Sequence, residues 1–169
     1  MKRKTIILLL GILSLFVASP AHADIVWPAL YLITRMVTWW SIALGLIVEY
    51  LFVRKLTHFD IRKSILVDLS MNLASCLLGI ILIPLFGVAW EYFPGIVLYK
   101  LFNIGTFSPG TWTATFFFAV FMNALLENFV INKGFKKKLG WRGFWWLSLA
   151  NGASVGIAFI SLWLIPLEL

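Results

Sequence analysis

The chain has 169 residues, of which 62% are hydrophobic and only 12% are charged, and its mean hydropathy is +0.96. Soluble domains are about 45–50% apolar and about 25% charged, and a chain of this size has too little interior to bury so much apolar surface. The composition argues against a soluble enzyme, a disordered tail and a nucleic-acid-binding domain. It predicts a polytopic membrane protein, in which the basic residues behind the net charge of +7 set the orientation.

Residues 1–23 have the pattern of a secretory signal peptide. Three basic residues at positions 2–4 precede an apolar run over residues 5–17, and an Ala-His-Ala motif ends at Ala23. The apolar run is shorter than the roughly 20 residues that a spanning helix needs. We expect cleavage after Ala23, which leaves Asp24 outside the membrane. An uncleaved anchor is the alternative, and it gives the same topology.

The remaining chain, 24–169, is predicted to form a single four-helix transmembrane domain. Its four apolar segments each have the length of a spanning helix and lack a polar outer face. They run over about Met36 to Val53, Ser64 to Phe86, Thr111 to Ile131, and Phe144 to Ile165. The predicted fold class is therefore an all-α integral membrane protein.

The connections predict the orientation of these helices. The two short connections 54–63 and 133–142 hold most of the basic residues that follow the signal peptide. Positively charged loops stay on the cytoplasmic side. We therefore expect a multi-pass inner-membrane protein with both mature termini on the periplasmic or extracellular side.

The outer connection, 87–110, is aromatic and rich in turn-forming residues. Within it, residues 96–103 are apolar and predict a short helix lying in the membrane interface. Ser108 followed by Pro109 is a start signal for the third span. Residues 24–28, with Trp39 and Trp40, predict a second aromatic anchor on the same side.

The two halves of the chain resemble each other. Asn-Leu-Ala-Ser at 72–75 matches Asn-Gly-Ala-Ser at 151–154, and Glu49 aligns with Glu127. We interpret this as a duplication of a helical hairpin, with repeat halves at about 36–86 and 111–165. Both hairpins would run in the same direction, related by a pseudo-twofold axis normal to the membrane.

Each predicted span carries one stripe of small and polar residues at helical spacing. Small residues let helix backbones approach and polar ones hydrogen-bond across, so these stripes should face one another. Charged side chains inside a membrane are costly and mark candidate sites. The candidate polar site consists of Glu49, Asp68, Asn72, Glu127 and Asn151.

These residues allow three interpretations. Glu49 and Glu127 could hold helices together through hydrogen bonds to asparagine. They could instead form a cation or proton site with Asp68, Asn72 and Asn151, in which neighbouring carboxylates share the bound charge. They could also reach the cytoplasmic interface and pair with basic residues. Asp68 has no counterpart in the second half, because Leu147 takes its place.

Other residue types add little chemistry. Cys76 is the only cysteine and lies in an apolar run, so we expect a small buried hydrophobe. His58 is expected to be a solvated loop residue. The sequence contains no phosphate-binding loop, catalytic triad or metal-ligand spacing. We therefore expect no metal and no cofactor, and we favour an enzyme less than the functions below.

Two functions follow from the sequence. The first is a structural or assembly subunit of a membrane complex. The alternative is a small transporter or channel that moves a cation or protons along the Glu and Asn residues. The expected partners are the lipid bilayer and either further copies of the chain or another membrane protein, and no nucleic acid.

Overall fold

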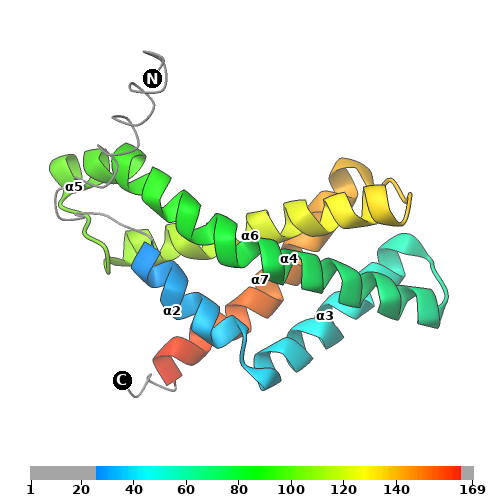
Figure 1. Cartoon of the computed structure of the whole chain (residues 1–169). Helices are drawn as coiled ribbons and strands as arrows, with labels where there is room; N and C mark the ends of the chain where they lie inside the picture. The colour runs from blue at the N-terminus through cyan, green and yellow to red at the C-terminus, as the bar shows by residue number, and fades with distance from the viewer. Residues whose placement is uncertain (1–25, 165–169) are drawn as a thin grey trace, which may run out of the picture.

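The computed structural model describes residues 26–164, and over this range the chain is all-helical and contains no strand. Four long helices dominate (Figure 1), namely α3 (Trp39–Thr57), α4 (Ile61–Trp90), α6 (Pro109–Phe129) and α7 (Gly140–Leu164). They overlap the four apolar segments predicted from the sequence. The predicted signal peptide and its cleavage site lie outside the described residues.

Local capping explains where two of these helices begin. The Asp60 side chain accepts a 2.7 Å hydrogen bond from the Lys63 backbone N–H and starts α4. Ser108 accepts from the Thr111 N–H at the start of α6, with Pro109 in the first turn. The predicted start signal for the third span is thus confirmed.

Three helical stretches of the described chain are long and apolar enough to cross a membrane: Ile61–Phe102, Pro109–Gly134 and Gly140–Leu164. Helix α3 meets this test only together with the preceding helix, α2 (Val26–Met36), from which it is bent by 80°. Residues 26–164 therefore contain three such stretches, or four when the bent pair counts as one span. A membrane protein is supported on length and composition.

Helix α2 is an element that the sequence interpretation missed, since it expected only an aromatic anchor in this region. Ala29 and Leu32 on α2 are buried, and the helix packs against α4, α6 and α7. Thr38 leaves the helical conformation, with φ −71° and ψ 144°, and its hydroxyl donates a 2.7 Å hydrogen bond to the Arg35 carbonyl. This capped break separates α2 from α3.

The four long helices form a ring in which α3 and α6 each contact both α4 and α7. Two apolar cores fill it along its length. One includes Val53, Met71 and Leu147, and the other includes Ala119 and Val155. The outer surface is apolar as well, as lipid-facing helices require.

The connections lie at the two ends of the bundle. The α3–α4 and α6–α7 turns, which carry the basic residues, lie at the same end (Figure 1, right). The other end holds α5 (Ile96–Phe102), which is separated from α4 by a kink over Glu91–Gly95 with non-helical backbone at Phe93. The predicted short helix over 96–103 is thus present. A π-helical turn (Val130–Gly134) extends α6.

Candidate functional site

Three carboxyl groups are buried inside the helix ring. Glu49 of α3, Asp68 of α4 and Glu127 of α6 are 3%, 4% and 1% exposed. Each lies on a helix face with buried small or polar residues one turn away, such as Gly45 before Glu49 and Asn123 before Glu127. The fold therefore brings together three acidic residues from three helices.

Glu127 is enclosed by protein and held by Asn151. The Asn151 Nδ2 donates a 2.6 Å hydrogen bond to Glu127 Oε2 and a second bond of 3.1 Å to the Leu147 carbonyl. Asn151 is fully buried. Glu127 Oε1 and Asn151 Oδ1 have no hydrogen-bond partner among the described residues. This pair is a side-chain bond between α6 and α7.

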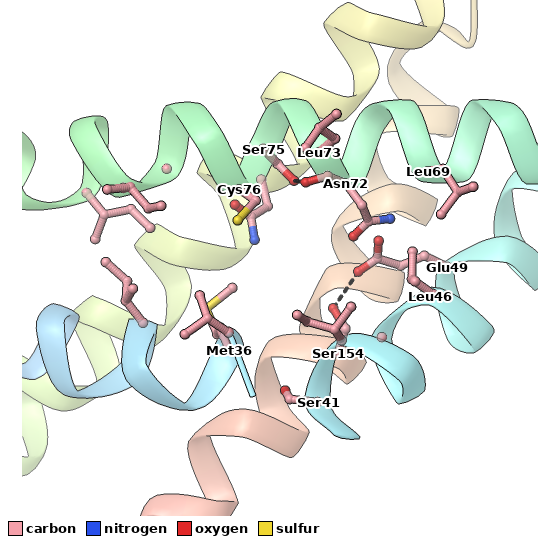
Figure 2. A pocket seen from close by; sticks show the side chains of 18 residues that line it. Met36, Ser41, Leu46, Glu49, Leu69, Asn72, Leu73, Ser75, Cys76 and Ser154 are labelled. Atoms are coloured by element: carbon pink, nitrogen blue, oxygen red, sulfur yellow. Dashed lines mark hydrogen bonds between the residues drawn. The ribbon is translucent and has the colours of Figure 1, made fainter. Parts of the chain in front are cut away.

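Glu49 has a different hydrogen-bond partner, which also lies on α7. The Ser154 hydroxyl of α7 donates a 2.6 Å hydrogen bond to Glu49 Oε1 (Figure 2). Its second oxygen, Oε2, is buried and has no hydrogen-bond partner among the described residues. Asn72 of α4 lies beside this carboxyl group (Figure 2) and donates to Asp68 Oδ1 at 3.3 Å. The Glu49 carboxyl group thus accepts a hydrogen bond from Ser154 and has the Asn72 side chain beside it.

A close helix contact makes the Ser154 bond possible. A Cβ atom placed on Gly45 would lie 3.5 Å from the Ser154 Cβ, so α3 and α7 approach closely at this point. Glu49 follows Gly45 by one helical turn on the same face. A small residue at position 45 therefore positions Glu49 for its bond to α7.

A groove of about 310 Å³ opens beside Glu49. Its walls come from α2, α3 and α4, and Asn123 of α6 and Ser154 of α7 also contribute to its lining (Figure 2). Glu49 and Asn72 belong to the lining, whereas Asp68, Glu127 and Asn151 do not. The five predicted site residues therefore fall into two environments, one at the groove and one enclosed between helices.

The exposure of Cys76 differs from what the sequence predicted. It was expected to be a small buried hydrophobe, but its side chain is exposed and lines the groove. The reason is that Cys76 lies on the face of α4 beside the groove, where α2 and α3 leave it uncovered. His58, in contrast, is an exposed residue at the end of α3, as predicted.

Two features of the site were not predicted from the sequence, namely the bond made by Ser154 and the groove. The matched Asn-x-Ala-Ser motifs marked Ser154 as unusual, but its bond to Glu49 depends on how α3 packs. Arg35, at the end of α2, is also buried at 8% exposure although no role was expected for it. Among residues 26–164, no group of three or more His, Cys, Asp or Glu residues is arranged to hold a metal ion.

A comparison with models of known protein families finds no match, and comparisons with curated proteins and with solved structures find none either.

Proposed function

We propose that this chain is a small membrane transporter or channel in which the Glu49 carboxyl group binds a proton or a cation. The observation that carries the proposal is the position of Glu49. It is a buried acid on the wall of an open groove, with one oxygen bonded to Ser154 and the Asn72 side chain beside it.

The physical argument rests on the cost of burying a carboxyl group. An acid inside an apolar bundle is costly unless hydrogen bonds, a counter-charge or a proton compensate it. Within the described part of the chain, no Lys or Arg lines the groove. A proton or cation arriving through the groove would supply the missing partner, while Ser154 keeps the carboxyl group oriented.

The helix order supports the proposed duplication. The predicted halves pair α3 with α6 and α4 with α7, and each of these pairs occupies opposite positions in the ring. Opposite positions are what a pseudo-twofold axis along the bundle requires. Because Glu49 lines the groove and Glu127 does not, we propose one working carboxyl group rather than a symmetric pair.

The proposal includes an inner-membrane location with both basic turns on the cytoplasmic side. Its support is that both turns lie at one end of the bundle, as the positive-inside rule requires of cytoplasmic loops. Four helices enclose little space, so a conducting path would run along the groove or between copies of the chain.

Flux measurements on reconstituted protein test the proposal. Proton and monovalent-cation flux is measured in liposomes for the wild type, Glu49→Gln and Glu91→Gln, a control at the far end of α4. We expect Glu49→Gln to lose flux while its circular dichroism spectrum and elution volume match the wild type, and Glu91→Gln to retain flux. Absence of wild-type flux under proton, sodium, potassium and organic-ammonium gradients would overturn the proposal, as would full flux in Glu49→Gln.

An assembly subunit is the second candidate, and the enclosed Glu127–Asn151 pair favours it. A polar pair without access to the groove acts through helix packing alone. If packing is the whole role of the acids, Glu49→Gln and Glu127→Gln both lower the yield of folded protein, and wild-type liposomes show no flux. This pattern separates the second candidate from the first.

A further inference from the structure

We propose that the groove beside Glu49 binds a monovalent organic cation with an apolar body, such as a substituted ammonium ion, that enters from the lipid side. This inference rests on the proposed role of Glu49 and specifies the class of ligand. It follows from the size of the groove, the chemistry of its walls and the direction in which it opens.

The size of the groove suits a small organic molecule. Its volume of about 310 Å³ lies at the lower end of the range for small-molecule sites, which is roughly 300–1,000 Å³. The groove is thus larger than a bare proton or a single metal ion requires.

The walls of the groove favour an apolar body. Most lining side chains are aliphatic or sulfur-containing, and they include Met36 of α2, Ile42 and Leu46 of α3, and Leu73, Ile80 and Ile83 of α4. Such walls cannot replace the hydration shell of an inorganic ion. The described residues also contain no group of His, Cys, Asp or Glu fit for a metal. An organic ligand therefore fits these walls better than a metal ion.

The single carboxyl group in the wall of the groove favours a ligand with one positive charge. Glu49 contributes the carboxyl group of the wall, and no basic or aromatic residue lines it within the described chain. A cation must therefore be neutralised by Glu49 and not by cation–π contacts. Asn72 lies beside Glu49 and adds polar atoms at this end of the groove, where the positive charge of the ligand would lie.

The groove opens toward the outer surface of the bundle. Ile42 of α3 and Leu73, Cys76 and Ile80 of α4 line it and are exposed. In a membrane this surface faces lipid, where amphipathic organic cations accumulate. The groove lies beside the 80° bend between α2 and α3, and residues on both sides of this bend line it.

Ligand binding can be measured through the reactivity of Cys76, because Cys76 lines the groove and is the only cysteine in the chain. The rate of its modification by N-ethylmaleimide is measured in detergent micelles by intact mass. The ligand is benzyltrimethylammonium, and the control ligand is neopentylbenzene, which has the same shape without the charge. We expect benzyltrimethylammonium to slow modification in a saturable way and neopentylbenzene to have little effect.

Substitutions in and beside the groove test where benzyltrimethylammonium binds. Glu49→Gln should raise the half-protecting concentration of benzyltrimethylammonium by about tenfold or more, because a buried charge loses its partner. Leu73→Trp should obstruct the opening and weaken protection while Glu49 stays in place. Leu77→Trp is its matched control, because Leu77 is 59% exposed against 62% for Leu73 but does not line the groove.

Each outcome bears on one claim. Equal protection by the two ligands would identify an apolar occupant such as a lipid chain and overturn the inference, as would protection that survives in Glu49→Gln. No protection, combined with Glu49-dependent flux in liposomes, would reject the organic cation and leave the proposed function standing. Protection without flux of protons, sodium, potassium or benzyltrimethylammonium would support the cation site and reject transport.

Discussion

The Ser154 hydroxyl donates a 2.6 Å hydrogen bond to Oε1 of Glu49 and joins α7 to α3 across 105 residues of sequence. One turn earlier on α7, Asn151 donates a 2.6 Å bond to Glu127 of α6. Helix α7 therefore bonds to both glutamates, through different side chains. The two acids occupy matching positions in the predicted repeat, yet only Glu49 lines the groove.

Removing the Ser154 hydroxyl should destabilise the bundle. In Ser154→Ala, Glu49 loses its hydrogen-bond donor from α7, and an unsatisfied buried polar group costs about 1–3 kcal/mol. Unfolding is measured by denaturant titration in micelles. Ser161→Ala is the control, because Ser161 is buried and, among the described residues, its hydroxyl donates to the Ala158 carbonyl of its own helix. Equal losses in the two variants would show that the Glu49 bond contributes no stability.

The Glu127–Asn151 pair should show strong coupling. Asn151→Leu leaves the buried Glu127 carboxyl without its donor, so we expect a loss of about 1–3 kcal/mol in unfolding free energy. Replacing both partners by leucine should recover part of this loss, since the polar group that lacks a partner is then gone. A double-mutant cycle measures the coupling. Additive losses would contradict a direct bond between α6 and α7.

The approach of α3 to α7 at Gly45 should tolerate only small residues. A Cβ at position 45 makes an ordinary 3.5 Å contact with Ser154, so Gly45→Ala should be nearly neutral. Gly45→Leu should push the helices apart and cost about 1–3 kcal/mol in unfolding free energy. Gly152→Leu is the matched control, because a Cβ there meets nothing within 4 Å. The idea fails if both leucine variants are equally stable.

Labelling of single cysteines tests the topology. In a Cys76→Ser background, His58→Cys and Lys136→Cys place thiols in the two basic turns, and Lys100→Cys places one on α5. All three native side chains are exposed. A membrane-impermeant maleimide should label the two turn positions in inverted vesicles and Lys100→Cys in spheroplasts. Labelling of the two turns from opposite faces would contradict the predicted orientation.

Much of the fold could be predicted from the sequence because the signals are local. Apolar length predicted α4, α6 and α7, and capping chemistry placed the start of α6 at Ser108 and Pro109. Helical spacing also placed Ser41, Gly45 and Glu49 on one face of α3, and all three are buried. Each inference needs only residues that are neighbours along the chain.

The sequence by itself thus determined the helical segments, their capping signals and which acids would have to be buried. The tertiary structure decided what surrounds each acid. The 80° bend between α2 and α3 leaves a groove beside Glu49 and exposes Cys76, whereas Glu127 is enclosed against α7. The physical reason is that periodicity fixes the face of a helix on which a residue lies. Whether a neighbouring helix covers this face or leaves it open depends on packing between segments that are distant in the sequence.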